Sequence, residues 1–403
     1  MFANKRRLMR LRSIKDVKGL EGKRVLVRVD ANVTILGGKA YDGDSGRIAK
    51  ACEGLAWLMK RKARVIVLSH LGRPKSSADK SCRLAPVAAR LSKRLGTKVL
   101  YDGSLIGPKA EALLARLPPG GVALLENVRF DKREEENDPA FAKALAALGD
   151  LYVNDAFSVS HRVHASVAAI QKLLPSYAGP LLVREITALD GVVRQPKHPF
   201  VLLLGGAKMK TKIKLIEHLG PKVDRLCIGG ALANTFLAAQ GIGVGKSLYE
   251  KEELMIAASL LKRFGNKIVL PAEVRVVTDI KKDRHPRMVA VGALKSNDVI
   301  VDVAPRSMRP FLREMGKAKT VVWNGPFGLC EVRSFRAGTY LIARAVASVK
   351  RATTIVGGGD TEPIVEALGI SKRFTLLSTG GGAMLAFLAG EKLPGVEPLI
   401  VRR

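Results

Sequence analysis

Cysteine is scarce in this chain, and no apolar run is long enough to cross a membrane. The four cysteines in 403 residues are far apart and include no C-x-x-C pair, which argues against a zinc site and against a disulfide framework. No apolar run reaches the roughly 18 residues that a membrane-spanning helix needs. The basic N-terminal stretch, residues 1–16, lacks the apolar segment of a secretory signal. We therefore expect a cytoplasmic protein without a membrane partner.

Acidic residues are few compared with basic ones. The chain has 36 Asp and Glu against 68 Lys and Arg, a formal net charge of +32. Such a charge attracts polyanions, and it motivates one alternative interpretation, a nucleic-acid-binding protein. The basic residues are spread along the chain, however, and no homeodomain, zinc-finger or ribonucleoprotein signature accompanies them. We therefore expect no specific nucleic-acid partner.

The chain also lacks a G-x-G-x-x-G motif after its first strand-like run. The sequence there is "VRVDANVTI", which disfavours a dinucleotide-binding domain. Most of the strand-like runs end at a glycine or at a polar residue. That pattern is expected where ligands bind at the carboxyl ends of a parallel sheet.

Apolar runs of strand length alternate with helical stretches in two successive series. Runs that are apolar on both faces are typical of buried parallel strands, and the chain is long enough for two domains. We therefore predict an α/β protein with two doubly wound parallel-sheet (Rossmann-like) domains, joined near residues 176–193 by a hinge helix. The predicted strands are 24–30, 64–70, 98–102, 122–127 and 151–155, then 200–206, 225–230, 268–271, 320–325 and 353–359.

In the first series, polar and charged side chains follow successive strands. They are Asp30, Asn32, Arg47, His70, Arg73, Arg129 and Arg162. One basic residue at a strand end is most often a solvated charge. Several at one edge of a sheet would converge on a small polyanion, because guanidinium groups donate paired hydrogen bonds to phosphate and carboxylate.

In the second series, the strands are followed by glycine-rich turns. Such turns at helix N-termini can bind phosphate through free N–H groups, although a single cluster of glycines is more often only a tight turn. Lys208 and Lys212 lie four residues apart at one of these turns. Asp360 could hold Mg²⁺ or cap a helix, and Glu331 could accept ribose hydroxyls or simply be exposed. An anion cradle and a nucleotide site on separate domains fit phosphoryl transfer, which depends on positioning and charge neutralisation.

The order of the motifs resembles the phosphoglycerate kinase family. The motifs are "RVDANV", "SHLGRPK", "LLENVRF", "NDAF…HRVHAS", "GGAK…KI", "WNGPFG…E", "GGGDT" and "STGGGA". The similarity extends from about residue 14 to residue 398, and eight ordered motifs argue against chance agreement. Scarce glutamine and asparagine, three and nine residues, indicate a heat-adapted source, and the resemblance is to the archaeal or thermophile branch of the family.

The resemblance implies a reaction and a division of labour. The reaction is reversible in-line phosphoryl transfer, on domain closure, from 1,3-bisphosphoglycerate to Mg-ADP, giving 3-phosphoglycerate and ATP in glycolysis and gluconeogenesis. The acceptor of the kinase in the reverse direction is a carboxyl group, the metal is Mg²⁺ on Asp360, and the protein is expected to be a monomer. Residues 1–183 would bind 3-phosphoglycerate (1–13 being a basic extension), residues 184–390 would bind the nucleotide, and the tail 391–403 would return toward the N-terminal domain.

The resemblance also implies individual roles. Arg47 and Lys208 would be catalytic. The residues for 3-phosphoglycerate would be Asp30, Asn32, Arg47, His70, Leu71, Gly72, Arg73, Arg129 and Arg162. The residues for the nucleotide would be Gly205, Gly206, Lys208, Lys212, Asn324, Gly325, Glu331, Gly358, Gly359, Asp360 and Thr361. The chain departs from the family pattern at Thr34, in the loop 158–160, and at Ala231, Glu273 and Ala386, none of which removes a proposed catalytic group.

One stretch, "GIGVGKSLYE" at 241–250, contains the Gly-Lys-Ser of a phosphate-binding loop. A Walker loop needs G-x-x-x-x-G-K-[ST] directly after a strand, but Gln240 occupies the position of its first glycine and the preceding residues have helical periodicity. We therefore expect Lys246 to be a surface residue. The phosphates are expected at the turns 205–212, 325–328, 357–361 and 379–382.

Overall fold

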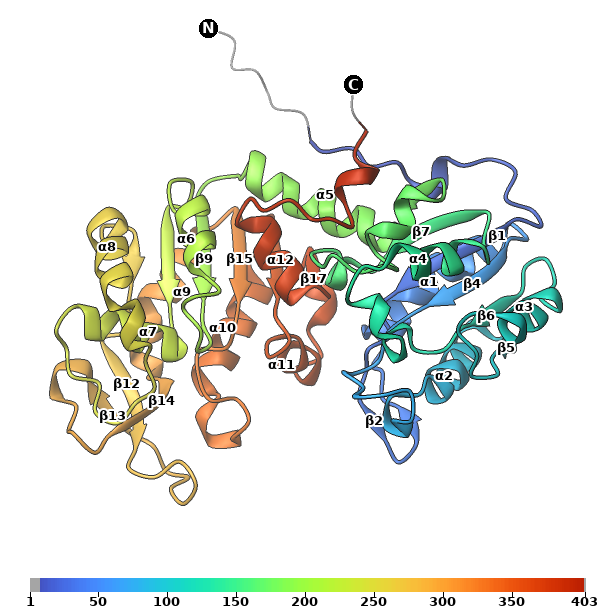
Figure 1. Cartoon of the computed structure of the whole chain (residues 1–403). Coiled ribbons are helices and arrows are strands. Elements are labelled where there is room, and N and C mark those ends of the chain that lie inside the picture. Colours follow the sequence, from blue (N-terminus) through green and yellow to red (C-terminus); the bar gives the residue numbers. More distant parts are fainter. Residues whose placement is uncertain (1–7, 402–403) are drawn as a thin grey trace, which may run out of the picture. The chain divides into compact units, whose positions relative to one another are not determined.

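The computed structural model describes residues 8–401, and these form two compact units. The first comprises residues 8–187 together with 392–401, and the second comprises Ala188–Glu391. Each unit is built on a six-stranded parallel sheet with helices around it (Figure 1). Within the described residues, no helix is long and apolar enough to span a bilayer.

The sheet of the first unit consists of β1 (Arg24–Val29), β4 (Arg64–Leu68), β5 (Val99–Leu100), β6 (Val122–Leu124), β7 (Leu151–Asp155) and β8 (Ser176–Ala178). Their order is β5-β6-β4-β1-β7-β8, and every neighbouring pair is parallel. The helices of this unit are α1 (Arg47–Met59), α2 (Ala85–Leu95), α3 (Pro108–Ala115) and α4 (Pro139–Ala146). Parallel neighbours place the carboxyl ends of β6, β4, β1 and β7 side by side at one edge.

Alternate residues of β1 enter two different apolar cores. Val25 and Val27 pack in a cluster with residues of α1 and α2, including Leu55. Leu26 packs in a second cluster with residues of α3 and α4, including Phe141. A strand that is apolar on both faces is therefore covered on both, as the sequence pattern predicts.

Helix α5 (Pro180–Arg194) leads into the second unit. Its sheet has the order β11-β10-β9-β15-β16-β17, again with all neighbours parallel. The strands are β9 (Phe200–Leu204), β10 (Arg225–Ile228), β11 (Ile268–Val269), β15 (Thr320–Asn324), β16 (Thr353–Gly357) and β17 (Leu376–Ser378). The helices are α6 (Ile213–Leu219), α7 (Gly230–Ala239), α8 (Leu254–Phe264), α9 (Met308–Lys317), α10 (Ala337–Ser348), α11 (Glu362–Ala367) and α12 (Gly381–Leu388). The prediction of two doubly wound α/β sheets is confirmed.

Two antiparallel pieces were not predicted from the sequence. In the second unit, β12 (Glu273–Val277), β13 (Arg287–Ala290) and β14 (Val299–Val303) form a small sheet in the order β13-β12-β14. In the first unit, β2 (Ile35–Leu36) and β3 (Lys39–Ala40) form a short hairpin. Strands β12 and β14 of the small sheet contribute to a cavity described below.

The two ends of the described chain pair with each other on the first unit. Leu11 forms an antiparallel bridge with Ile400, and Arg12 N donates to Leu399 O at 2.8 Å. Leu11 is buried, so the chain is already part of the fold at this residue. The rest of the expected basic extension, residues 1–7, lies outside the described residues.

Asp155, the last residue of β7, is a buried carboxylic acid that caps helix α5. Its Oδ1 accepts hydrogen bonds from Leu181 N at 2.8 Å and Leu182 N at 3.1 Å. Its Oδ2 has no hydrogen-bond partner among the described residues. Burial raises the pKa of Asp155 to about 7, against the lowering effect of these two amides. The neutral acid is therefore the form that the fold prefers.

This preference predicts an inverse dependence of stability on pH. Between about pH 4 and 7 the unfolded chain has released the Asp155 proton that the folded chain keeps, so this residue's contribution to stability falls as pH rises through that window. Asp155→Asn keeps the cap without an ionisable group. We expect the free energy of unfolding of the variant, relative to wild type, to rise on the order of 2 kcal/mol between pH 5 and pH 8. Urea denaturation measures it, and parallel pH profiles would contradict the assignment.

Candidate active site

In the first unit, the loops that follow four neighbouring strands carry polar residues at the same edge of the sheet. Asp30 follows β1, His70 follows β4, Arg129 follows β6, and Arg162 follows β7. The topology thus brings together residues that are up to 132 positions apart, from Asp30 to Arg162.

Asp30 is the buried centre of this edge. It is 4% exposed, and its Oδ2 accepts from Arg47 Nη1 at 2.9 Å and from the Ser158 hydroxyl. Its Oδ1 accepts from Asn32 N at 2.9 Å. Burial alone would raise the pKa of Asp30, but the charge of Arg47 and the hydrogen bonds hold it below its usual value. Asp30 is therefore an ionised carboxylate that orients Arg47.

Arg47 is the first residue of α1, and the backbone amides at the start of this helix donate to Asp42, in the loop before it. Asp42 Oδ1 accepts from Ile48 N at 3.0 Å and Oδ2 from Ala49 N at 3.1 Å. Arg94 forms an ion pair with the same carboxylate at 3.0 Å. The loop before α1 is thereby tied down, which fixes where the Arg47 side chain leaves the backbone.

The loop after β4 is held by buried polar side chains. Ser69 Oγ accepts from Ala31 N at 3.0 Å, and Asn127 Nδ2 donates to Leu71 O at 2.8 Å. Asn32 Oδ1 accepts from Gly72 N at 2.8 Å, and Gly72 has a φ of +63°, a conformation that favours glycine. Asn32, Leu71 and Gly72 therefore shape this loop through the backbone.

The arginines of the edge differ in their surroundings. Arg129 Nη1 donates to Gly72 O at 2.7 Å, and its Nε lies 3.3 Å from Glu135 Oε1. Arg162 is half-buried, and its Nε has no hydrogen-bond partner among the described residues. Arg73 is exposed. Arg129 and Arg162 are close enough for the charge of Arg162 to lower the pKa of Arg129, in addition to the larger effect of burial. Neighbouring like charges of this kind favour a bound anion.

In the second unit, the glycines at the strand ends allow backbones to touch. A Cβ on Gly205 would lie 2.2 Å from Pro326 O, and one on Gly325 would lie 2.5 Å from Gly205 O. The amides at these turns are already used, because Gly205 N donates to Asn324 O at 2.9 Å and Gly206 N to Pro326 O at 2.7 Å. The expectation of free phosphate-binding amides was therefore wrong at Gly205, Gly206 and Gly325, the last of which donates to Thr361 Oγ1 at 3.1 Å.

The two lysines of the turn after β9 are unlike each other. Lys208 is exposed, whereas Lys212 is 6% exposed and its Nζ lies 3.3 Å from Lys208 O. Burial lowers the pKa of Lys212, while the charges of Glu250 and Asp360 act in the opposite direction. Lys212 is thus a buried cation that faces two carboxylates and the Gly206 turn, where a Cβ would lie 3.7 Å from its Nζ.

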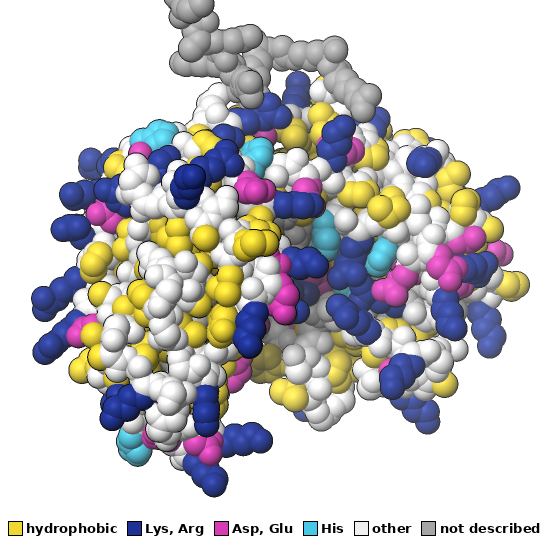
Figure 2. Space-filling view, turned by 60° about the vertical axis from the view of Figure 1, so that its left-hand side comes forward, with side chains coloured by type: hydrophobic (Ala, Val, Ile, Leu, Met, Phe, Trp, Pro, Cys, Tyr) yellow, Lys and Arg dark blue, Asp and Glu magenta, His cyan; other side chains and the backbone are white. Residues whose placement is uncertain are grey.

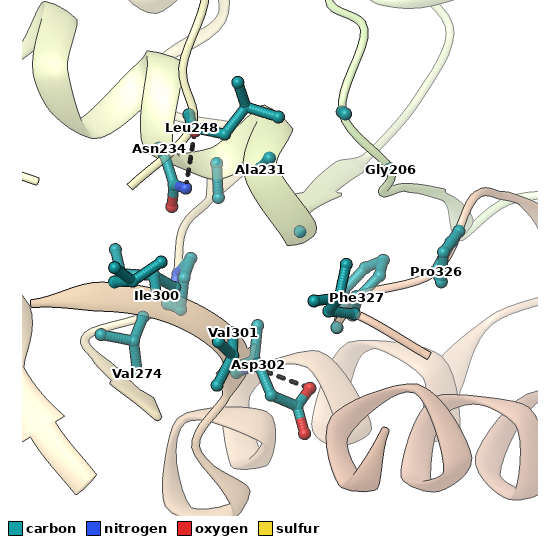
Figure 3. A pocket seen from close by; sticks show the side chains of 18 of the residues that line it. Gly206, Ala231, Asn234, Leu248, Val274, Ile300, Val301, Asp302, Pro326 and Phe327 are labelled. Atoms are coloured by element: carbon teal, nitrogen blue, oxygen red, sulfur yellow. Dashed lines mark hydrogen bonds between the residues drawn. The ribbon is translucent and has the colours of Figure 1, made fainter. Parts of the chain in front are cut away.

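A cavity of about 400 Å³ opens beside these turns (Figure 3). Its size lies in the range of small-molecule sites. Its walls come from the turns after β9 and β10, from β14 and from the loop after β15, with mostly apolar side chains such as Leu248, Val274 and Val301. Glu331 and Asp360, both exposed, also line it. The Asp302 carboxylate lines the cavity too but is bound to Val303 N and Gly338 N, at 2.9 and 3.0 Å.

The turn after β16 is connected to the turn after β15 by a hydrogen bond to Thr361. Thr361 is buried, and its Oγ1 accepts from Gly325 N. Gly358 has a φ of +122°, and Gly359 and Asp360 are exposed. Asn324 Nδ2 donates to Gly357 O at 2.9 Å, which ties the ends of β15 and β16 together. Asn324 and Thr361 thus support the turn that carries Asp360.

The stretch 241–250 is not a Walker loop, since it follows helix α7, but it belongs to the site. Gly245 approaches the Asp298 carbonyl so closely that a Cβ would lie 2.4 Å from it. Ser247 Oγ accepts from Ile300 N at 2.8 Å, and Glu250 accepts from Met209 N. Lys246 is exposed, as expected, but it also lines the cavity. Lys246 and Leu248 of this loop therefore lie at the cavity wall, which the sequence pattern did not predict.

Several structuring residues had been missed. Ser69, Asn127 and Glu250 act through hydrogen bonds to loops that only the tertiary structure brings together. Ser158 stood out in the sequence only as a departure from the family pattern, and its bond to Asp30 comes from the structure. Arg28 is different, because a charged residue inside the apolar run "RVLVRVD" is visible in the sequence. That signal could have drawn attention to it.

The chain matches known proteins along nearly its whole length. A family profile described as phosphoglycerate kinase matches residues 14–391. The chain belongs to the phosphoglycerate kinase family. The phosphoglycerate kinase of Thermomicrobium roseum is 47% identical over 393 residues, covering 97% of this chain and 99% of that protein. The cytosolic phosphoglycerate kinase of Triticum aestivum is 45% identical over 386 residues, covering 94% and 96%.

Solved structures agree with this assignment. Phosphoglycerate kinase from Coxiella burnetii has a TM-score of 0.84 at 40% identity and covers 97% of this chain and 99% of its own. The enzyme from Pyrococcus horikoshii has a TM-score of 0.86 at 28% identity, covering 96% and 98%. Nothing in these comparisons supports the alternative of a nucleic-acid-binding protein. The basic side chains are scattered over the face shown in Figure 2, and the high charge accompanies a phosphoglycerate kinase fold.

Proposed function

We propose that the protein catalyses the reversible transfer of a phosphoryl group from 1,3-bisphosphoglycerate to Mg-ADP, giving 3-phosphoglycerate and ATP. The observation that carries this is the set of arginines and a histidine at four adjacent strand ends, in a chain of the phosphoglycerate kinase family. Such a set suits a ligand with carboxylate and phosphate groups. The role of the chain in glycolysis and gluconeogenesis follows from this reaction.

The first unit is proposed to bind 3-phosphoglycerate. Arg162, whose Nε lacks a partner among the described residues, and Arg129 would hold an anionic group. His70 and Asn32 would contact oxygens of the ligand, and Asp30 would receive a hydroxyl. The other proposed contacts are Leu71, Gly72 and Arg73, on the loop after β4.

The second unit is proposed to bind the nucleotide. The apolar cavity walls suit the base, and Glu331 at the same cavity would accept the ribose hydroxyls. Lys212 and the exposed Lys208 would contact the phosphates, together with the turn Gly358, Gly359 and Thr361. Gly205, Gly206, Asn324 and Gly325 would shape the floor of the site through their mutual contacts.

Asp360 fits the role of the Mg²⁺ ligand. Mg²⁺ commonly takes one or two carboxylates plus substrate phosphates, and Asp360 is an exposed carboxylate at the cavity. The described residues contain no group of three or more acidic, histidine or cysteine side chains that would hold a metal by themselves. When bound, the ion would neutralise charge on the nucleotide phosphates.

Catalysis would depend on cations that surround the transferred group. Arg47 from the first unit and Lys208 from the second would stabilise the charge on the phosphoryl oxygens in the transition state. The Asp30 carboxylate keeps Arg47 oriented before the reaction, which reduces the reorganisation needed. In-line transfer requires the two ligands to meet, so closure of the units and exclusion of water are part of the proposal.

An assay of ATP formation tests the proposed function. Purified protein is supplied with 1,3-bisphosphoglycerate, ADP and Mg²⁺, and ATP is followed by luciferase. We expect turnover that requires all three and that reverses when 3-phosphoglycerate and ATP are supplied. Absence of turnover in both directions from folded protein would overturn the proposal.

The two lysines near the cavity should behave differently. Lys212→Met removes a buried cation, and we expect the KM for ADP to rise about 10- to 100-fold, as for a lost charge-assisted hydrogen bond. Lys246→Met is the matched control, because Lys246 is exposed at the cavity, and its KM should change by no more than about threefold. Steady-state kinetics with ADP varied measures both. A larger effect at Lys246 than at Lys212 would reverse the assignment.

The proposal includes a monomer in the cytoplasm with small-molecule partners. The Triticum aestivum relative is named as a cytosolic phosphoglycerate kinase. Light scattering after size exclusion tests the monomer, for which a mass of 43.4 kDa is expected.

A further inference from the structure

Arg28 is a charged residue buried inside the parallel sheet of the first unit. It lies in β1 between apolar neighbours and is 1% exposed. None of the roles proposed above uses it. Burying a guanidinium is costly unless every side of it is bonded, so its partners indicate what it does.

Each nitrogen of the Arg28 guanidinium has a partner. Nε donates to Ser166 Oγ at 2.9 Å, and Nη1 donates to Val29 O at 2.5 Å. Nη2 lies 3.2 Å from Nδ1 of His70. The contact with His70 joins a residue of β1 to the loop that follows the neighbouring strand β4.

The far side of Arg28 is held by a buried acid. Ser166 Oγ, which accepts from Arg28, donates to Glu134 Oε1 at 2.6 Å, and Ser166 N donates to Oε2 at 2.8 Å. Glu134 is fully buried. The serine hydroxyl has one proton, which it donates in the hydrogen bond to Glu134, so its oxygen is left to accept from Arg28. Glu134 thus orients Ser166, and Ser166 orients the Arg28 guanidinium.

The contact between Arg28 and His70 decides where the imidazole proton lies. An arginine side chain has only donors and stays protonated. Nδ1 of His70 must therefore accept, and in the neutral ring the proton must be on Nε2. This is the one side-chain hydrogen bond of His70 among the described residues, and the ring is 4% exposed.

We infer that Arg28 is a positioning residue that holds His70 in the neutral tautomer with its proton on Nε2, so that the ring offers an N–H donor to the acidic substrate without a charge of its own. The inference rests on the proposed function, because the acceptor is an oxygen of 3-phosphoglycerate. The tautomer itself depends only on the free protein.

The charges around His70 keep the ring neutral. Burial lowers its pKa well below the usual value, and the positive charge of Arg28 adds to this. Asp30 acts in the opposite direction, while Arg129 and Arg47 lower the pKa further. A cationic His70 would be repelled by Arg28, Arg129 and Arg47. A neutral ring can donate a hydrogen bond to the substrate without this repulsion.

The first experiment uses the wild-type protein without substrate. Two-bond ¹H–¹⁵N correlation spectra of ¹⁵N-histidine protein distinguish the two tautomers and the imidazolium, and the His70 signals are assigned by their loss in His70→Gln. We expect the pattern of a proton on Nε2, unchanged between pH 6 and 8. A proton on Nδ1, or titration of His70 in that range, would overturn the inference even if ATP formation is normal.

The second experiment removes the hydrogen bond from Arg28 to His70. Arg28→Met keeps an apolar stem, and we expect the KM for 3-phosphoglycerate at pH 8 to rise about tenfold with kcat within about threefold. The same two-bond spectra of Arg28→Met locate the pH range in which its His70 becomes charged, which should lie above that of the wild type because one lowering charge is gone. As pH falls through that range, the ratio of kcat/KM between variant and wild type should recover, because the imidazolium has Nε2–H whatever the tautomer. The substrate phosphate titrates equally in both proteins and cancels in the ratio.

Two controls separate positioning from a structural role. Arg24→Met, at the exposed start of the same strand, removes a half-exposed arginine paired with Asp150, and its kcat/KM ratio should stay near one at every pH. In a His70→Gln background, the kcat/KM of the Arg28→Met double variant, divided by that of His70→Gln alone, should not vary with pH. A ratio for Arg28→Met that is constant with pH in the His70 background would show a merely structural effect and contradict the inference.

Discussion

Replacing Arg47 with alanine is expected to lower kcat by at least about 10² to 10³, as for removal of one preorganised donor to a transition state. The KM for ADP should change little, because Arg47 belongs to the first unit and the proposed nucleotide residues to the second. The loss in kcat is expected because Arg47 is already oriented in the free protein, where Asp30 Oδ2 accepts from Arg47 Nη1 at 2.9 Å. Initial rates of ATP formation with saturating 1,3-bisphosphoglycerate measure kcat.

Arg61→Ala is the matched control for this prediction. Arg61 lies just beyond the opposite end of helix α1, where its guanidinium stacks 3.5 Å from the Trp57 ring centroid. Its loss should leave kcat within about twofold, since an exposed side chain of this kind contributes little. Full activity in Arg47→Ala, with Arg61→Ala also active, would remove Arg47 from the catalytic role.

The largest effect on stability is expected for Gly205→Ala. The added Cβ would lie 2.2 Å from Pro326 O and 2.7 Å from Gly325 O, both backbone atoms. Neither can move without separating the ends of β9 and β15, which also share the bond from Gly205 N to Asn324 O. We expect a loss of about 3 kcal/mol or more. For a unit of this size that lowers the melting temperature by roughly 6 to 12 °C.

The measurement can be confined to the second unit. The chain has two tryptophans, Trp57 in the first unit and Trp323 in the second, so a Trp57→Phe background leaves Trp323 fluorescence as the reporter. Gly243→Ala is the matched control, because nothing lies within 4 Å of the Cβ it would add. Equal melting temperatures for the two glycine variants would contradict the close approach of the backbones.

The main strands could be predicted because they are apolar on both faces. Each predicted run contains an observed strand, such as β1 within 24–30 and β15 within 320–325. The short strand β8, only Ser176–Ala178, was hidden in the stretch assigned to the linker. The sheet of β12, β13 and β14 was also missed, since its strands have mixed exposure and β13 is mostly exposed. Short or exposed strands depend on their neighbours more than on their own pattern.

The candidate site was predictable where chemistry is carried by the side chain itself. Asp30, His70 and Arg129 lie within five residues after the ends of buried strands, and the parallel order of β6, β4 and β1 then places them at the same edge. The supporting residues were not predictable in the same way. Asn127 and Ser158 are ordinary loop residues in the sequence and gain a role only from a bond across the fold.

By itself, the sequence determined the fold class, the family motifs and the edge of the sheet at which the proposed substrate residues lie, because burial pattern and residue type are local properties. The tertiary structure decided which groups are already in use. It showed that the amides of Gly205, Gly206 and Gly325 are bonded internally, and that the loop 241–250 lines the cavity and supports it through Ser247 and Glu250. It also joined Arg28 to His70. Such facts depend on distances between segments far apart in the chain, and a hydrogen bond exists only at its distance.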